Sequence, residues 1–175
     1  LAKSQGNYTF PADFMLVAAM NPCQCGNYPN VEKCTCTQKQ IQQYLGKISQ
    51  PFLDRMDICA EAPRTEYEAL STQKVQETSE QIRQRVCSVR EIQRNRYQGT
   101  EIHTNARLGM KELEVYCRLG REEEQLMKRA FSALGLTART YHKILRVART
   151  IADMDGEDQI RTSHIKEAIS YRSLD

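Results

Sequence analysis

The sequence predicts an α/β segment followed by an all-α segment, and three observations support this fold class. Residues 14–20 (FMLVAAM) form a nearly continuous apolar run, which is typical of a strand covered on both faces of a parallel sheet. From residue 74 onward, apolar side chains recur instead at helical spacing, and glycines stand where helices would end. Hydrophobic residues make up 40% of the 175 residues, enough for a core, while no apolar run approaches the roughly 20 residues that a membrane-spanning helix needs.

Residues 1–64 contain the expected α/β elements. Residues 8–10 predict a short strand, and residues 14–20 predict the buried strand described above. Thr37 is the expected N-cap of a short helix over residues 38–47. The chain then continues with two short elements, a helical turn over residues 52–55 and a second strand over residues 56–60.

A long amphipathic helix over residues 74–97 is expected to connect the two parts of the chain, within a linking segment 65–102. Between residues 74 and 96 there are six positive and three negative side chains, a net charge of +3 that equals the excess of the whole chain. Such a helix is either a solvated surface or a contact with nucleic acid, and net charge alone does not decide between them. Its apolar stripe is expected to consist of Val75, Ile82, Val86, Val89 and Tyr97.

Residues 103–175 predict a bundle of helices, three of them marked by residues 113–119, 121–134 and 137–154 and the last beginning near residue 162. Thr137 is the expected N-cap of the third helix, and Thr162 or Ser163 that of the last. Short connections between these helices favour antiparallel packing. The side chains expected to face the core from the last two helices are Ile144, Leu145, Ala148, Ile151, Ala152, Ile165, Ala168 and Ile169.

Four cysteines follow the apolar run in two C-x-C pairs: Cys23, Cys25, Cys34 and Cys36. The eight residues between the pairs include several turn formers, so the pairs can converge. Four thiolates around one divalent ion form a closed structural zinc site with no open position for catalysis. Two disulfides or four free thiols are the alternatives, and the odd total of seven cysteines argues against complete pairing.

Three polar side chains are candidates for a ligand site. Asn21 follows the predicted buried strand, and ligands of parallel α/β sheets bind beyond the carboxyl ends of the strands. Arg55 has an acidic residue on either side, so it either forms a local ion pair or is held in place to reach a phosphate of another subunit. Arg139 lies in the first turn of a predicted helix, where a bound anion would offset the unfavourable effect of a cation. The ordinary alternatives are a loop asparagine, a surface ion pair and a solvated arginine.

Three stretches together resemble one family, the magnesium-chelatase-like AAA+ ATPases of the ComM and YifB type. They are FMLVAAMNPC from residue 14, SQPFLDRMD from residue 49 and LTARTYHKILRVARTIAD from residue 136. The resemblance covers essentially the whole chain, and the cysteine quartet fits this subgroup rather than AAA+ proteins at large. It implies the C-terminal part of a AAA+ P-loop core, with short parallel strands, followed by a helical lid.

The resemblance also implies roles for the three candidates. Asn21 matches sensor 1, which helps to position the water that attacks the γ-phosphate of ATP. Arg55 matches the arginine finger that completes the site of the neighbouring subunit, and Arg139 matches the sensor 2 arginine of the lid. These residue types suit phosphoryl transfer, which needs positioning and charge neutralisation more than covalent chemistry.

The sequence departs from the family in two respects. It contains no G-x-x-x-x-G-K-[ST] phosphate loop. It also has no apolar strand that ends in an acidic pair for Mg²⁺. We therefore expect a fragment that is inactive alone. The resemblance implies that the full-length protein is an ATPase that forms a hexameric ring and acts on DNA. We expect it to be cytoplasmic and to have no membrane partner. The alternative is a zinc-stabilised DNA-binding or scaffold module without an ATPase role.

Overall fold

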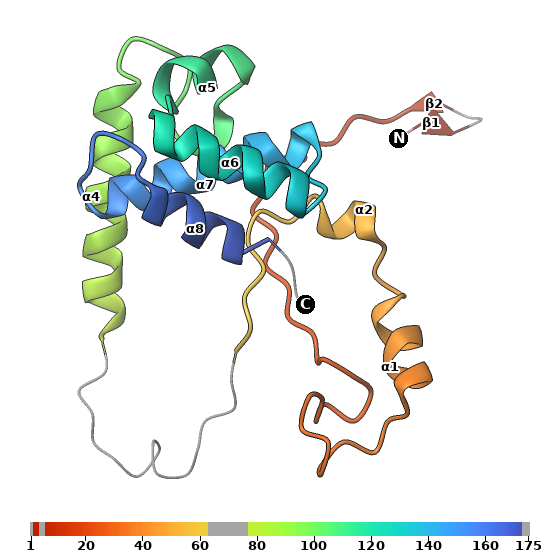
Figure 1. Ribbon diagram of the computed structural model, residues 1–175. Coiled ribbons are helices and arrows are strands. Elements are labelled where there is room, and N and C mark those ends of the chain that lie inside the picture. Colours follow the sequence, from red (N-terminus) through yellow and green to blue (C-terminus); the bar gives the residue numbers. More distant parts are fainter. Residues whose placement is uncertain (1, 4–5, 63–76, 173–175) are drawn as a thin grey trace. The chain divides into compact units, whose positions relative to one another are not determined.

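The computed structural model describes residues 2–3, 6–62 and 77–172 (Figure 1). The chain divides into two compact units, residues 1–49 and residues 50–175. Among the described residues, no helix combines the length and the apolar character that crossing a membrane requires. Each unit is considered by itself below.

The first unit contains little regular structure. Strands β1 (Ala2–Lys3) and β2 (Gly6–Asn7) pair in antiparallel fashion, with Ala2 opposite Asn7. Helix α1 (Gln38–Leu45) begins at the predicted N-cap Thr37, whose side chain accepts a hydrogen bond from the backbone N–H of Gln40. The Gln40 side chain in turn accepts from the Thr37 backbone N–H, which completes a capping box.

The predicted strands over residues 8–10, 14–20 and 56–60 are wrong for this structure, in which these residues form neither helix nor strand. The apolar run is instead solvent-exposed, with Met15 87% and Val17 80% exposed. A strand exists only when a neighbouring strand accepts and donates its backbone hydrogen bonds, and the described residues provide no such neighbour. The α/β core is therefore not formed here, whereas the helical part of the predicted fold class is confirmed.

The second unit is helical. Its elements are α2 (Gln50–Leu53), α4 (Ser79–Arg96), the 3₁₀-helix η1 (Asn105–Arg107), α5 (Met110–Tyr116), α6 (Arg121–Ala133), α7 (Ala138–Met154) and α8 (Thr162–Ser170). Helix α7 contacts α4, η1, α5 and α8, so it is the central element of this unit. Figure 1 shows α5, α6 and α8 grouped around it.

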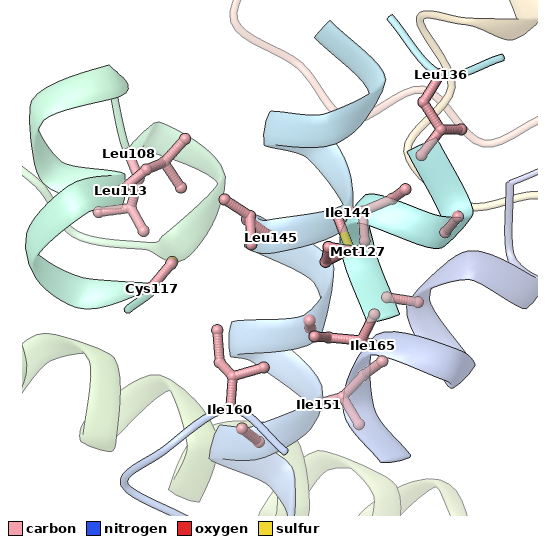
Figure 2. Packing of buried hydrophobic residues seen from close by; sticks show 14 of the residues in the cluster. Leu108, Leu113, Cys117, Met127, Leu136, Ile144, Leu145, Ile151, Ile160 and Ile165 are labelled. Atoms are coloured by element: carbon pink, nitrogen blue, oxygen red, sulfur yellow. The ribbon is translucent and has the colours of Figure 1, made fainter. Parts of the chain in front are cut away.

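A single apolar cluster holds the second unit together, and Figure 2 shows its members converging on α7. Ile144, Leu145 and Ile151 of α7 pack with Leu113 of α5 and Ile165 of α8. Each fully buried side chain of this kind stabilises the fold by about 1.5–3 kcal/mol. All the side chains of α7 that we expected to face inward are buried, as are Ile165 and Ala168 of α8, while Ile169 is partly buried.

Helix α4 is anchored to this core by its C-terminal half. Val89 and Tyr97 are buried as predicted, but Ile82 and Val86 are 43% and 49% exposed, so the predicted apolar stripe is wrong for the first half of the helix. Val75, the remaining member of that stripe, and the predicted helical start at residues 74–76 lie outside the described residues. Thr78 caps the observed start with a capping box of its own.

The start of α8 differs slightly from the prediction. The helix begins at Thr162, but its N-cap is Arg161 rather than Thr162 or Ser163. The backbone N–H of Arg161 donates to Nδ1 of the buried His164, at 3.0 Å. The ring of His164 thus accepts from the backbone N–H of the N-cap residue, as a Glu or Gln side chain at the same position does in a capping box.

Candidate functional site

The four cysteines converge in the first unit. The Cys23 Sγ lies 3.4 Å from the Cys25 Sγ and 3.8 Å from the Cys34 Sγ, and the Sγ atoms of Cys25 and Cys34 are 3.6 Å apart. The Cys36 Sγ completes the group, with all four sulfur atoms within 4.8 Å of one another. In a tetrahedral site with Zn–S bonds of about 2.3 Å, neighbouring sulfurs are about 3.8 Å apart. All four thiols are free, so the cluster could hold a metal ion such as zinc, and the disulfide alternative is not formed.

Local turns bring the two C-x-C pairs together. The backbone N–H of Gly26 donates to the Cys23 carbonyl at 3.0 Å, and that of Cys34 donates to the Asn30 carbonyl at 2.9 Å. Gly26 has φ +72°, in the left-handed region that a residue with a Cβ rarely adopts. The turn formers between the pairs therefore act as predicted from their residue types.

Backbone and thiol neighbours make the cysteines unequal acids. A hydrogen bond from the Asn27 backbone lowers the pKa of Cys25 to about 5, against the opposing effect of burial. At Cys34 a hydrogen bond from the Cys36 backbone acts in the same direction, but burial and the neighbouring thiols together raise the pKa to about 11. A divalent cation held by all four sulfurs would override these differences, because metal-bound cysteines are thiolates.

Asn21 lies beside this cysteine loop. Its side chain is exposed and packs toward the turn at Gly26, where an added Cβ would lie 3.6 Å from the Asn21 Cγ. The residue was expected at the carboxyl edge of a parallel sheet, and no such edge is formed by the described residues. The structure thus brings Asn21 together with the cysteine cluster, within the first unit.

Arg55 lies in the second unit, directly after α2. Two backbone hydrogen bonds close a turn around it, from the Arg55 N–H to the Phe52 carbonyl and from the Met56 N–H to the Leu53 carbonyl, both at 2.9 Å. The guanidinium is exposed and its Nη1 donates to the Pro51 carbonyl. The side chain is therefore exposed, and it is hydrogen-bonded back to the start of a turn with a defined backbone.

Arg139 also lies in the second unit, as the second residue of α7. The predicted N-cap Thr137 is confirmed, since its Oγ1 accepts from the Thr140 backbone N–H at 3.2 Å. Arg139 is exposed at this helix N-terminus, where the backbone N–H groups favour a nearby anion.

Lys143 connects the Arg55 turn to α7, and sequence reasoning missed it. Its Nζ donates to the backbone carbonyls of Asp54 and Met56, the residues on either side of Arg55. The only sequence signal was its position one helical turn after Arg139, which places both on one face of α7. Burial lowers the pKa of the Lys143 ammonium, while the carboxylates of Asp57 and Asp54 oppose that shift.

Comparison with known proteins completes the description of the site. Residues 76–172 match the family model described as "Magnesium chelatase, subunit ChlI C-terminal", and residues 1–70 match the model described as "Magnesium chelatase, subunit ChlI". The chain is 43% identical over 175 residues to the competence protein ComM of Haemophilus influenzae. The aligned region covers 99% of this chain and 33% of that protein.

Two further relatives show the same pattern of coverage. The uncharacterized protein YifB of Escherichia coli is 39% identical over 176 residues, covering 100% of this chain and 34% of that protein. An uncharacterized protein of Mycobacterium tuberculosis is 33% identical over 172 residues, covering 98% of this chain and 34% of that protein. The chain thus spans about a third of the length of the curated relatives it matches.

Proposed function

Because this chain belongs to the magnesium-chelatase family of the ComM and YifB type, we propose that it supplies the sensor and arginine-finger half of a AAA+ ATPase site. The observation that carries the proposal is the pair of exposed arginines on one packed unit, Arg55 on a closed turn and Arg139 at a helix N-terminus. Both residues are exposed, which supports access by a triphosphate, and the Arg55 guanidinium would exchange its bond to the Pro51 carbonyl for the phosphate. Hydrolysis of ATP at a shared site between subunits is the activity that uses both.

Each proposed role follows from the chemistry of the side chain. The Asn21 amide can orient a water molecule for attack on the γ-phosphate, since it offers both a donor and an acceptor. Arg55 would neutralise charge that develops on the γ-phosphate held by the next subunit, and Arg139 would contact phosphates of the nucleotide in its own subunit. Phosphoryl transfer needs this positioning and charge stabilisation more than a covalent partner.

The phosphate loop and the acidic residues for Mg²⁺ must come from sequence outside these 175 residues, because no G-x-x-x-x-G-K-[ST] motif occurs in them. We expect residues 14–20 to form a buried strand once that sequence is present. The exposure of Phe14, Met15 and Val17 supports this, since large apolar side chains are rarely left in solvent along one continuous run.

A ring of subunits acting on DNA is the wider proposal. A finger that works on a neighbour's nucleotide requires an oligomer, and the family suggests a hexamer. Helix α4 carries exposed arginines at positions 83, 85 and 90. Arg85 pairs with Glu77, while Arg83 and Arg90 are seven positions apart on one face of the helix and offer a basic surface suited to phosphate backbones. The relative in Haemophilus influenzae is named a competence protein, which agrees with a role on DNA.

Zinc is the metal we propose for the four cysteines, in a structural role. Four thiolates at the observed spacing complete its tetrahedral shell, so the ion would stiffen the loop beside Asn21 without taking part in hydrolysis. Mg²⁺ would belong with ATP at the phosphate loop.

The test uses a protein in which these 175 residues are joined to the phosphate-loop segment that precedes their counterpart in the relatives. Arg55→Ala should lower the rate of ATP turnover by about 10³-fold or more, the range that arginine fingers supply, while nucleotide binding stays within about twofold. Arg118→Ala removes an exposed arginine from the end of α5 and is the matched control.

Two outcomes of this experiment would decide against the proposal. Normal turnover by the Arg55→Ala protein refutes the finger role. Salt-dependent DNA binding by the 175-residue chain, combined with no effect of either Arg55→Ala or Arg139→Ala on turnover, would favour the alternative of a zinc-stabilised DNA-binding module.

A further inference from the structure

One side chain of α7, that of Lys143, attaches the turn that carries Arg55 to the helix. Lys143 donates from a single Nζ to the carbonyls of Asp54 and Met56, which flank Arg55 in the chain. The Asp54 carbonyl belongs to the peptide group that precedes Arg55, and the Met56 carbonyl belongs to the peptide group that joins Met56 to Asp57, so the two bonds lie on either side of Arg55. Fixing both restricts rotation of the backbone at Arg55 far more than one bond to either would.

Apolar contacts and a backbone bond reinforce this attachment. Leu53 and Met56 line a small pocket together with Ile144 and Val147 of α7, and the pocket encloses about 10 Å³, no more than one water molecule needs. Further along, the Cys59 backbone N–H donates to the Tyr171 carbonyl at 2.8 Å, just after α8. The segment from Leu53 to Cys59 is thus attached to the helical bundle by apolar contacts, by a backbone hydrogen bond and by the charged side chain of Lys143.

The charges around the Lys143 ammonium explain how it can be held in this half-buried place. Burial lowers the pKa of Lys143, and Arg139 acts in the same direction, while the carboxylates of Asp57 and Asp54 in the Arg55 turn offset part of that effect. A side chain without a hydrogen-bond donor would leave the carbonyls of Asp54 and Met56 without this partner, which costs free energy.

Arg139 and Lys143 are one helical turn apart on α7, so a displacement of this part of the helix moves both. Arg139 is proposed to contact the nucleotide of its own subunit, and Lys143 holds the turn whose arginine is proposed to reach the neighbour's nucleotide. Two sites that bias the same rigid element are coupled, and the coupling is reciprocal.

We propose that Lys143 is a positioning residue for the Arg55 finger and that the first two turns of α7 couple the nucleotide sites of adjacent subunits. This inference rests on the proposed function, because it assigns regulation to the same site. It makes a specific claim that the function alone does not: the finger is fully effective only when Lys143 ties its turn to α7.

The experiment compares Arg55→Ala, Lys143→Met and the double variant in the protein joined to its phosphate-loop segment. Methionine keeps the stem of Lys143 but removes the donor. We expect Lys143→Met to lower the kcat for ATP about 10–100-fold at an unchanged KM, since misplacing a catalytic group by about 1 Å costs on that order. The double variant should be no slower than Arg55→Ala alone. Lys166→Met, at an exposed position on α8, is the control and should turn over normally.

The outcomes distinguish a failure of this inference from a failure of the proposed function on which it rests. Normal turnover by Arg55→Ala overturns the proposed function. Impaired Arg55→Ala together with normal Lys143→Met overturns only the role of Lys143. A double variant that is slower than Arg55→Ala by the full Lys143→Met factor overturns it too, because independent effects would then add.

Hydrogen exchange provides a second measurement, which requires no ATPase activity and can be made on more than one variant. In the 175-residue chain, hydrogen exchange of the Met56 and Cys59 amides should be at least about tenfold faster in Lys143→Met than in the parent, with α6 unchanged. Lys143→Gln, which can still donate to one carbonyl, should fall between the two and serves if the methionine variant fails to fold. Parent-like exchange in the glutamine and methionine variants would overturn the proposal.

Discussion

Arg149 is a charged side chain that the core encloses almost completely, with 2% of its surface exposed. Its Nε donates to Oδ1 of Asp153 at 3.0 Å, and its two Nη atoms donate to the carbonyls of Asp158 and Glu157. Asp153 also accepts from Arg96, so two guanidinium groups share one buried carboxylate. The group joins α4, α7 and the loop after α7 through charge-assisted hydrogen bonds.

Removing one member of this group should cost far more than removing a surface arginine. Arg149→Met leaves the carbonyls of Glu157 and Asp158 without this donor and takes one partner from the buried Asp153, so we expect the free energy of unfolding to fall by about 3–5 kcal/mol. Urea unfolding followed by far-ultraviolet circular dichroism measures the difference.

The matched control for that change is Arg94→Met. Arg94 pairs with Glu91 at 3.1 Å, but both side chains are more than half exposed, and such pairs contribute less than about 1 kcal/mol. Equal losses in the two variants would show that the buried group adds nothing beyond an ordinary surface pair.

At the scale of single elements, helices were predicted well because their signals are local. Helix α7 begins after Thr137 and ends at Met154 as expected, and α6 ends one residue from its predicted boundary. A cap, an apolar stripe and a terminal glycine all lie within a few residues of the helix they define. The run at residues 14–20 carries an equally clear strand signal, yet a strand also needs a partner that lies far away in sequence or outside it.

The N-cap of α7 allows a direct test at this scale. Thr137→Ala removes the acceptor for the Thr140 backbone N–H and should destabilise the second unit by about 1 kcal/mol, as seen for cap deletions generally. Thr137→Ser keeps the hydroxyl and should stay within about 0.5 kcal/mol of the parent.

Thermal unfolding of the three proteins gives the comparison. If the alanine and serine variants unfolded at the same temperature, the cap would not contribute, and α7 would be held at its start by packing of Ile144 and Leu145 alone.

At the scale of the whole molecule, sequence reasoning selected candidate site residues but did not predict the contacts between them. Arg55 and Arg139 were chosen from residue type and local context, and both lie exposed in the second unit. The link through Lys143 was not predictable, because its acceptors come from carbonyls 89 and 87 positions away in the chain. The cysteine cluster was predictable because its ligands and the turns that join them lie within 14 consecutive residues, 23–36.

The two units should also differ in what keeps them folded. Of the described residues in the first unit, only Cys23 and Ile41 are buried. Burial of one apolar side chain stabilises the folded state by about 1.5–3 kcal/mol at most. A structural zinc held by cysteine and histidine ligands contributes on the order of 10–16 kcal/mol to the folding of small zinc domains at pH 7. The metal, rather than an apolar core, is therefore the expected source of order around the cysteine loop.

Metal removal should consequently act on one unit alone. We expect about one zinc per chain by elemental analysis of the reduced protein, from the four ligands of a closed site. Stripping it with a chelator should speed amide exchange across residues 22–46, while α6, α7 and α8 keep their protection because the apolar cluster around α7 contains no metal ligand. Cys25→Ser should lose the metal and Cys87→Ser, at an exposed position on α4, should retain it. A reduced chain that contains no zinc yet protects the amides of residues 22–46 would rule out a metal-dependent first unit.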